Sequence, residues 1–116
     1  MSLAGVELMY KLIFFVPATH LEAVKSAVFK LGAGKSKKYG ACCWETLGTL
    51  QYIPLENSHP EVGAKGELCA TPEYKVEVLC ENADLENIIE GMIKAHPYEE
   101  PAFEIHPFRT SLKDFT

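Results

Sequence analysis

Apolar residues occur along the chain with two different spacings. The run YKLIFFV, residues 10–16, is rich in β-forming residues and too short for an ordinary helix, so it predicts a buried strand that Pro17 ends. The following segment is apolar at helical intervals, which predicts an amphipathic helix. Its apolar stripe consists of Leu21, Val24, Val28 and Leu31.

The ends of this first helix carry recognisable signals. Thr19 followed by Glu22 fits a capping box, in which each side chain accepts a hydrogen bond from a free backbone N–H of the first turn. Gly32 and Gly34 supply the left-handed backbone positions with which helices commonly end. We therefore expect a helix from about Thr19 to Gly32.

The middle of the chain predicts strands. Residues 39–53 are mostly aromatic, small or β-branched, and indicate a long strand that bends or bulges near Gly48. A polar loop with two prolines and two glycines follows at 54–66. Two strands then come at 67–71 and 73–81.

The second of these two strands, separated from the first around Pro72, alternates strictly. Apolar and polar side chains take turns, as in a strand with one buried and one exposed face. The inward set is Tyr74, Val76, Val78 and Cys80, and the outward set is Glu73, Lys75 and Glu77.

A second helix and a last strand complete the pattern. Asn82 or Asp84 caps the helix, and Pro97 disfavours the helical conformation at the residue before it, so the helix ends by about His96. A strand is expected at 102–108. The side chains expected to face inward from the helix are Leu85, Ile88, Ile89, Met92 and Ile93.

The element order β-α-β-β-α-β predicts an α+β protein, a ferredoxin-like sandwich with an elaborated middle hairpin and two helices on one sheet face. We expect one domain, with a core over about 10–108, an N-terminal arm at 1–9 and a polar tail at 109–116. The other sheet face is left uncovered, which favours self-association through the strands of 39–53 and 65–81.

Charge narrows the function classes. The net charge is −5, and a protein that binds nucleic acid broadly needs a dense basic face. No apolar run approaches the ~18 residues of a membrane span, and the first residues lack the basic start of a signal peptide. We therefore expect no nucleic-acid or membrane partner and a cytoplasmic location.

The four cysteines are Cys42, Cys43, Cys69 and Cys80. They form no CxxC pair, and their spacing from histidines does not resemble a zinc finger or ribbon. We expect four free thiols that behave as small apolar residues, with a thiol or metal role as the alternative.

The segment GAGKS at 32–36 invites comparison with a phosphate-binding loop. That motif needs a glycine where Phe29 stands, and it joins a strand to a helix, whereas this segment follows a helix. The remaining signal is a basic turn containing Lys35, Lys37 and Lys38. A solvated turn is the simple interpretation, and an anion contact is the alternative.

The segment HPYEEP at 96–101 concentrates polar side chains between two prolines. A ligand or divalent-metal site could use its side chains together with another histidine or a cysteine. The candidate contact residues are His96, Tyr98, Glu99, Glu100, His106 and Cys42. The alternative is a structural corner in which these groups bond backbone atoms freed at the end of the helix. Adjacent glutamates in an extended segment tend to diverge, which favours the corner.

Three segments carry a family resemblance: AHPYEEPAFEI, VPATHLEAV and GAG…YGACCWETLGT. They resemble the inserted domain of YqfO-type proteins of the Nif-three-like (NGG-interacting-factor-like) family, here as a separate chain, over roughly residues 10–108. The resemblance implies a fold similar to CutA and the PII proteins, and a trimer rather than a dimer. It also implies that the family's metal ligands lie in flanking regions that this sequence does not contain. Leu50 stands where the family usually has a second glycine.

Two classes of function remain open. One is a non-catalytic regulatory or interaction module that self-associates, with an unidentified protein or small ligand as partner and no cofactor. The other is a small protein or enzyme that binds a divalent metal at the corner of His96 and Glu100. The first is favoured, because no catalytic grouping with a supporting motif is visible.

Overall fold

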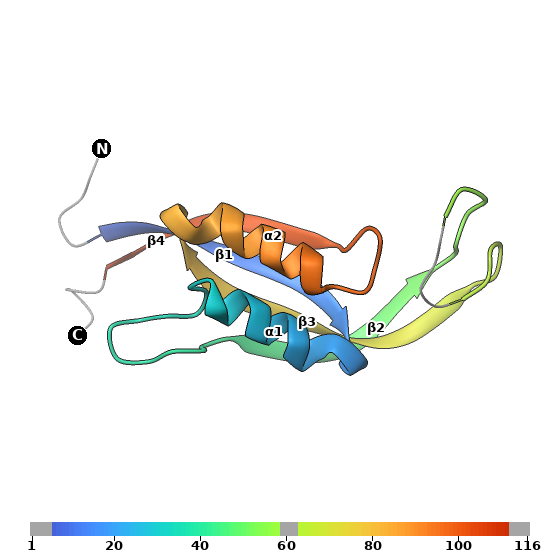
Figure 1. Ribbon diagram of the computed structural model, residues 1–116, viewed down its shortest axis with the longest axis horizontal. Coiled ribbons are helices and arrows are strands. Elements are labelled where there is room, and N and C mark those ends of the chain that lie inside the picture. Colours follow the sequence, from blue (N-terminus) through green and yellow to red (C-terminus); the bar gives the residue numbers. More distant parts are fainter. Residues whose placement is uncertain (1–5, 59–62, 112–116) are drawn as a thin grey trace.

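The structure is a computed structural model that describes residues 6–58 and 63–111. It has the predicted order of elements, which Figure 1 shows. A short 3₁₀ turn precedes each helix, at Ala18–His20 and Asn82–Asp84. The elements are β1 (Val6–Pro17), α1 (Leu21–Lys30), β2 (Trp44–Tyr52), β3 (Cys69–Glu81), α2 (Leu85–Ala95) and β4 (Phe103–Ser111).

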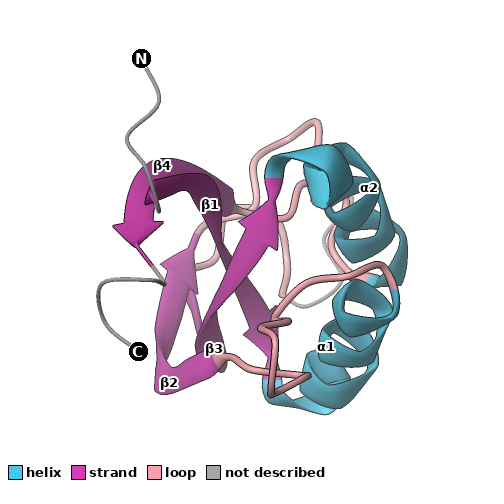
Figure 2. Cartoon of the chain, turned by 90° about the vertical axis from the view of Figure 1, so that its left-hand side faces the viewer, coloured by secondary structure: helices cyan, strands magenta, loops and turns pink. Residues whose placement is uncertain are grey.

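The four strands form one antiparallel sheet in the order β2-β3-β1-β4. Both helices cover the same face, so the molecule has two layers (Figure 2). The α+β ferredoxin-like fold expected from the sequence is confirmed. Because β1 and β3 are the central strands, they contribute most of the side chains beneath the helices.

The core lies between the helices and alternate residues of the central strands, since successive side chains of a strand point to opposite faces. Phe14 of β1, Val76 of β3, Val24 of α1 and Ile88 of α2 are each fully buried there. Two residues expected in this core lie outside it: Leu31 is 40% exposed and Ile93 is 42% exposed. Leu31 follows the end of α1, where the helical stripe no longer determines its direction.

Both terminal strands extend further than predicted. β1 begins at Val6 and β4 continues to Ser111, and these two residues are partners in the antiparallel register. The expected arm at 1–9 and tail at 109–116 therefore overlap paired strands. Residues 1–5 and 112–116 lie outside the described part of the chain.

The predicted strand at 39–53 is shorter in the structure. Residues 39–43 form a connection, in which Ala41 has a φ of 53° and the Cys42 N–H donates to the Gly34 carbonyl over 2.9 Å. The expected bulge at Gly48 is absent from β2, because the register with β3 runs without interruption from Trp44 to Tyr52.

The two strands predicted at 67–71 and 73–81 form the single strand β3, which begins at Cys69. Pro72 does not interrupt it and lies opposite Thr49 of β2. The pairing of β3 with β1 ends at Glu73, so Pro72 has a neighbouring strand on one side only. A proline lacks an N–H donor and is tolerated in a strand where one side is unpaired.

The predicted N-terminal caps of both helices are wrong, whereas Gly32 and Gly34 have the left-handed backbone expected after α1, with φ of 110° and 71°. The Thr19 hydroxyl contacts the ring Nδ1 of His20 at 2.9 Å, and α1 has no side-chain cap at His20. Glu22 accepts a hydrogen bond from Lys25 over 3.1 Å. Asp84 stands at the N-cap of α2 without a side-chain bond. The 3₁₀ turns in front of both helices shift each start beyond the expected cap residue. The end of α2 at Ala95 is confirmed.

Gly34 provides a test of this fold. Its φ is +71°, and a Cβ there would lie within 2.4 Å of the Cys42 carbonyl oxygen. We expect Gly34→Ala to lower the free energy of unfolding by about 2–4 kcal/mol through backbone strain and the displaced connection. Urea denaturation followed by circular dichroism measures the change.

Gly40→Ala is the matched control. It lies in the same connection, and a Cβ there would meet no atom within 4 Å. Its effect should stay within about 0.5 kcal/mol, as for ordinary surface substitutions. Equal effects of the two substitutions would contradict the close approach at Gly34.

Candidate functional site

The segment 96–101, called the corner below, connects the end of α2 to β4. His96 is 7% exposed and has extended backbone angles, as expected for a residue before proline. Its ring Nε2 lies 2.6 Å from the backbone carbonyl oxygen of Phe15 in β1, and its Nδ1 accepts a hydrogen bond from the Tyr98 N–H over 3.1 Å. The His96 side chain thus joins the corner to β1, while the His96 backbone N–H donates to the Met92 carbonyl at the end of α2 over 3.0 Å.

These two bonds define the protonation of the ring. Since Nδ1 accepts a hydrogen bond, it carries no proton, and Nε2–H is the donor to Phe15. The imidazole is neutral with both nitrogens engaged. Burial lowers the pKa of His96, an effect that the hydrogen bond to Phe15 opposes.

Tyr98 follows directly and reaches β3. Its phenol donates to Oε2 of Glu73 over 2.5 Å. The ring also lies against His96, with centroids 5.0 Å apart and planes tilted by 55°. Burial and the hydrogen bond to Glu73 raise the pKa of the Tyr98 phenol, so it remains a donor at neutral pH. The corner therefore contacts both central strands of the sheet.

Glu73 is the buried carboxyl group of this site. It is 4% exposed, and its second oxygen, Oε1, has no hydrogen-bond partner among the described residues. Burial raises the pKa of Glu73, and the Tyr98 hydrogen bond partly offsets this. Thr71 acts in the opposite direction on Tyr98 and lowers its pKa, and Oγ1 of Thr71 is likewise buried without a hydrogen-bond partner in the described structure.

A pocket of about 380 Å³ lies over Glu73 and Tyr98. The β2–β3 hairpin, which projects beyond the helices in Figure 1, forms one wall, and the corner forms the other. Glu99 and Glu100 line the corner side. The apolar part of the lining consists of Phe15, Leu50, Tyr52, Ile53, Pro54 and Leu55.

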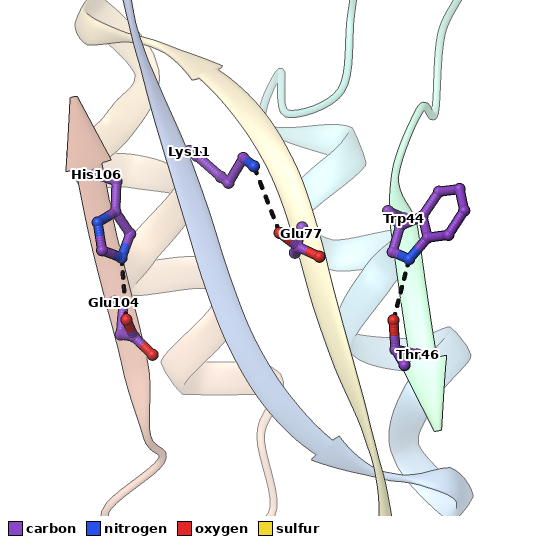
Figure 3. Close-up of polar contacts among 6 residues, drawn as sticks. All are labelled: Lys11, Trp44, Thr46, Glu77, Glu104 and His106. Atoms are coloured by element: carbon purple, nitrogen blue, oxygen red, sulfur yellow. Dashed lines mark hydrogen bonds and ion pairs between the residues drawn. The ribbon is translucent and has the colours of Figure 1, made fainter. Parts of the chain in front are cut away.

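The structure does not bring the remaining candidate residues to this pocket. His106 pairs with Lys11 in the register of β1 and β4, and its Nε2 lies 3.0 Å from Glu104 (Figure 3). Cys42 lines a separate depression beside Trp44 at the other end of the sheet. No group of three His, Cys, Asp or Glu side chains in the described ranges is arranged to hold a metal.

The basic turn is exposed. Lys35, Lys37 and Lys38 all face solvent, and the turn is closed by the Ser36 N–H, which donates to the Tyr39 carbonyl over 2.9 Å. The Ser36 hydroxyl also accepts from the Tyr39 N–H over 3.1 Å, so backbone groups and Ser36 hold the turn and the side chains of its lysines extend from it. The four cysteines are free thiols, and burial raises the pKa of Cys80 to about 11.

The uncovered sheet face, called the open face below, carries several polar side chains (Figure 3). It carries the ion pair between Lys11 and Glu77, at 3.4 Å, beside the contact of His106 with Glu104. Trp44 lies at its edge, 68% exposed, with its indole N–H donating to Thr46 over 3.0 Å.

Among the described residues, no helix is long and apolar enough to cross a membrane.

The chain is similar to known proteins over most of its length. No family model matches the chain. It is 38% identical over 101 residues to a GTP cyclohydrolase 1 type 2 homolog of Halalkalibacterium halodurans, an alignment that covers 87% of this chain and 27% of the relative. The structure of a Bacillus cereus protein related to NIF3 superposes with a TM-score of 0.76 and 33% identity, over 89% of this chain and 26% of that one.

The chain is homologous to a CutA/PII-like segment of these NIF3-related proteins. CutA from Archaeoglobus fulgidus has the same fold, with a TM-score of 0.63 and 15% identity over 92% of this chain and 90% of that one. Bacillus subtilis GlnK, solved as a complex with ATP, matches with a TM-score of 0.60 and 10% identity over 87% of this chain and 82% of that one. The chain spans about a quarter of the length of the curated relatives it matches.

Sequence reasoning found the corner of this CutA/PII-like domain but missed the residue that the corner covers. The alternation in β3 predicted that Glu73 lies on the sheet face opposite Tyr74 and Val76 and is exposed there. The predicted face is correct, but the predicted exposure is not. Tyr98, 25 residues further along the chain, makes that position buried. No local signal in the sequence reports this contact.

The two bonds of His96 predict a pH-dependent stability. The folded pKa of His96 lies below its unfolded value, so between the two values the unfolded chain binds more protons and acid favours unfolding. The contribution of His96 is complete above pH ~6.5 and is lost as the pH falls below that value. We expect His96→Ala to cost about 1–3 kcal/mol at pH 7.5 and to weaken this dependence. Urea denaturation between pH 5 and 8 measures both.

The exposed His106 supplies the control. His106→Ala should leave both the stability and its pH dependence close to those of the parent, because its pair with Glu104 is at the surface. A parent protein whose pH dependence survives His96→Ala would contradict the assigned role of the corner.

Proposed function

We propose that this CutA/PII-like domain is a non-catalytic regulatory or interaction module that self-associates through the open face of its sheet, as a trimer in preference to a dimer. The observation that carries the proposal is the open face itself. Both helices lie on the other side, so no helix of the described chain covers this face, and the corner covers it only around Glu73.

The composition of the open face suits a second copy of the chain. It carries cations, Lys11 and Lys75, and anions, Glu77 and Glu104. A face with both signs of charge can be complementary to a copy of itself, because each cation can meet an anion of the other copy. Trp44 adds a large exposed aromatic side chain at the edge, the residue type most enriched at interaction hot spots.

The engagement of His96 supports a regulatory role over a catalytic one. A general base or metal ligand needs a free ring nitrogen, whereas Nδ1 and Nε2 are both used in the corner. Metal binding at this histidine would require the corner to release Phe15 or the Tyr98 N–H. The fold is compatible with response to a small ligand, since GlnK with ATP shares it. A cytoplasmic location and an unidentified protein partner belong to the same proposal.

Self-association is tested by light scattering coupled to size-exclusion chromatography at micromolar concentration. The parent should have the mass of an oligomer, three chains being the favoured number. Trp44→Glu should shift the distribution toward the monomer by at least about tenfold in dissociation constant, because it places an added charge at the contact.

Leu47→Glu is the matched control, since Leu47 lies on the same strand but on the opposite face and is 59% exposed. It should leave the mass unchanged. A monomeric parent, or equal effects of the two substitutions, would contradict association through the open face.

A further inference from the structure

We propose that the pocket between the β2–β3 hairpin and the corner binds a small organic cation, with N–H donors on an apolar body, and that the Glu73 carboxylate anchors it. This inference extends the proposed function by naming the class of ligand to which the module responds. It rests on four features of the pocket: an unpaired buried oxygen, the sign of the charges, the apolar wall and the fixed position of the polar groups.

The unpaired oxygen is Oε1 of Glu73. Its partner oxygen, Oε2, accepts the phenol of Tyr98, whereas Oε1 is buried without a hydrogen-bond partner among the described residues. Leaving a buried acceptor unsatisfied is unfavourable, and native proteins rarely retain such a group without a reason. Glu73 lines the pocket, so a donor on a bound molecule can complete its hydrogen bonding.

The charges around the pocket are of one sign. Glu73, Glu99 and Glu100 all line it, and none of its described lining residues is Lys, Arg or His. Several carboxylates in a partly desolvated pocket attract cations and repel phosphates and carboxylates. The ligand is therefore of a different kind from the polyanionic ATP of the GlnK complex.

The apolar wall provides the binding surface for the body of the ligand. Phe15, Leu50 and Tyr52 project from alternate positions of β1 and β2 and line the pocket together. Aromatic faces bind cations as well as apolar groups. The volume of about 380 Å³ suits a small molecule.

The polar groups are held in place before a ligand arrives. Tyr98 is fixed at its backbone by His96 and at its phenol by Glu73, while Glu73 lies on the central strand β3. Groups on rigid elements lose little freedom when they bind. Because Oε1 is itself buried, an N–H donor reaches it only after the side chains over it shift, while the strands and the corner can stay in place.

The probe is benzamidine, whose planar amidinium presents two N–H groups to a carboxylate and whose ring matches the apolar wall. Isothermal titration calorimetry at pH 7.5 compares it with benzamide, which is neutral, and benzoate, which is an anion of the same shape. We expect benzamidine to bind at least about tenfold more tightly than benzamide, because charge-assisted hydrogen bonds are the stronger kind. Benzoate should not bind detectably.

Glu73→Gln keeps the shape of the side chain and its bond with Tyr98 but removes the charge, so it should weaken benzamidine at least about tenfold. Glu56→Gln is the matched control: Glu56 is an exposed carboxylate in the adjacent loop that does not line the pocket, and the net charge changes equally. It should change the affinity less than about twofold. Leu50→Trp fills the pocket from β2 and should abolish binding without touching any carboxylate.

Three results would overturn the proposal: no benzamidine binding at millimolar concentration, equal binding of benzoate, or unchanged affinity in Glu73→Gln. If Glu73→Gln proves unstable, Leu50→Trp still tests where benzamidine binds. A Leu50→Trp protein that is folded by circular dichroism should have lost the binding. Light scattering on the same samples separates this inference from self-association. A monomer that binds benzamidine refutes only the oligomer, and an oligomer that does not bind refutes only the pocket.

Discussion

The imidazole of His96 joins the two layers of this domain at one end. α2 lies in the helix layer and β4 in the sheet, and Pro97 forces the chain to leave the helix between them. The ring spans this step by donating to Phe15 on β1, 81 residues earlier, and by accepting the N–H of Tyr98. Without these two bonds, the direction in which the chain leaves α2 would not be fixed.

The position of Tyr98 depends on that histidine, and the burial of Glu73 depends on Tyr98. A carboxyl group that is 4% exposed, with one oxygen that has no partner among the described residues, opposes folding. Burial raises its pKa, and no cation in the described lining of the pocket compensates. Proteins retain such groups mostly where they have a function. Tyr98 therefore links a histidine that stabilises the fold to a carboxyl group that destabilises it, because it is hydrogen-bonded to both His96 and Glu73.

Local patterns in the sequence determine much of the fold. Strand alternation, the apolar stripes and the proline after α2 were sufficient for the order of elements and the α+β class, because each depends on residues close in the chain. The features that were wrong depend on distant partners. β1 reaches Val6 because Ser111 is there to pair with it, and Pro72 stays in β3 because β1 has already ended on that side.

The site divides in the same way. Pro97 and His96 predict a corner from a segment of six residues. The contact of Tyr98 with Glu73 forms only when β3 and the corner pack together. The pocket wall at Leu50 and Tyr52 likewise requires β2 to lie beside them. Charge alternation alone describes Glu73 as a solvated residue of a half-exposed strand. Tertiary packing reverses that description.

The state of the His96 ring tests this account most directly. Two-dimensional NMR that correlates ring protons with ring nitrogens distinguishes the two neutral tautomers and the imidazolium. At pH 7.5 the account predicts a neutral ring with the proton on Nε2 and an unprotonated Nδ1, as required for a donor to Phe15 and an acceptor from Tyr98. A proton on Nδ1, or the averaged signals of a free imidazole, would contradict it.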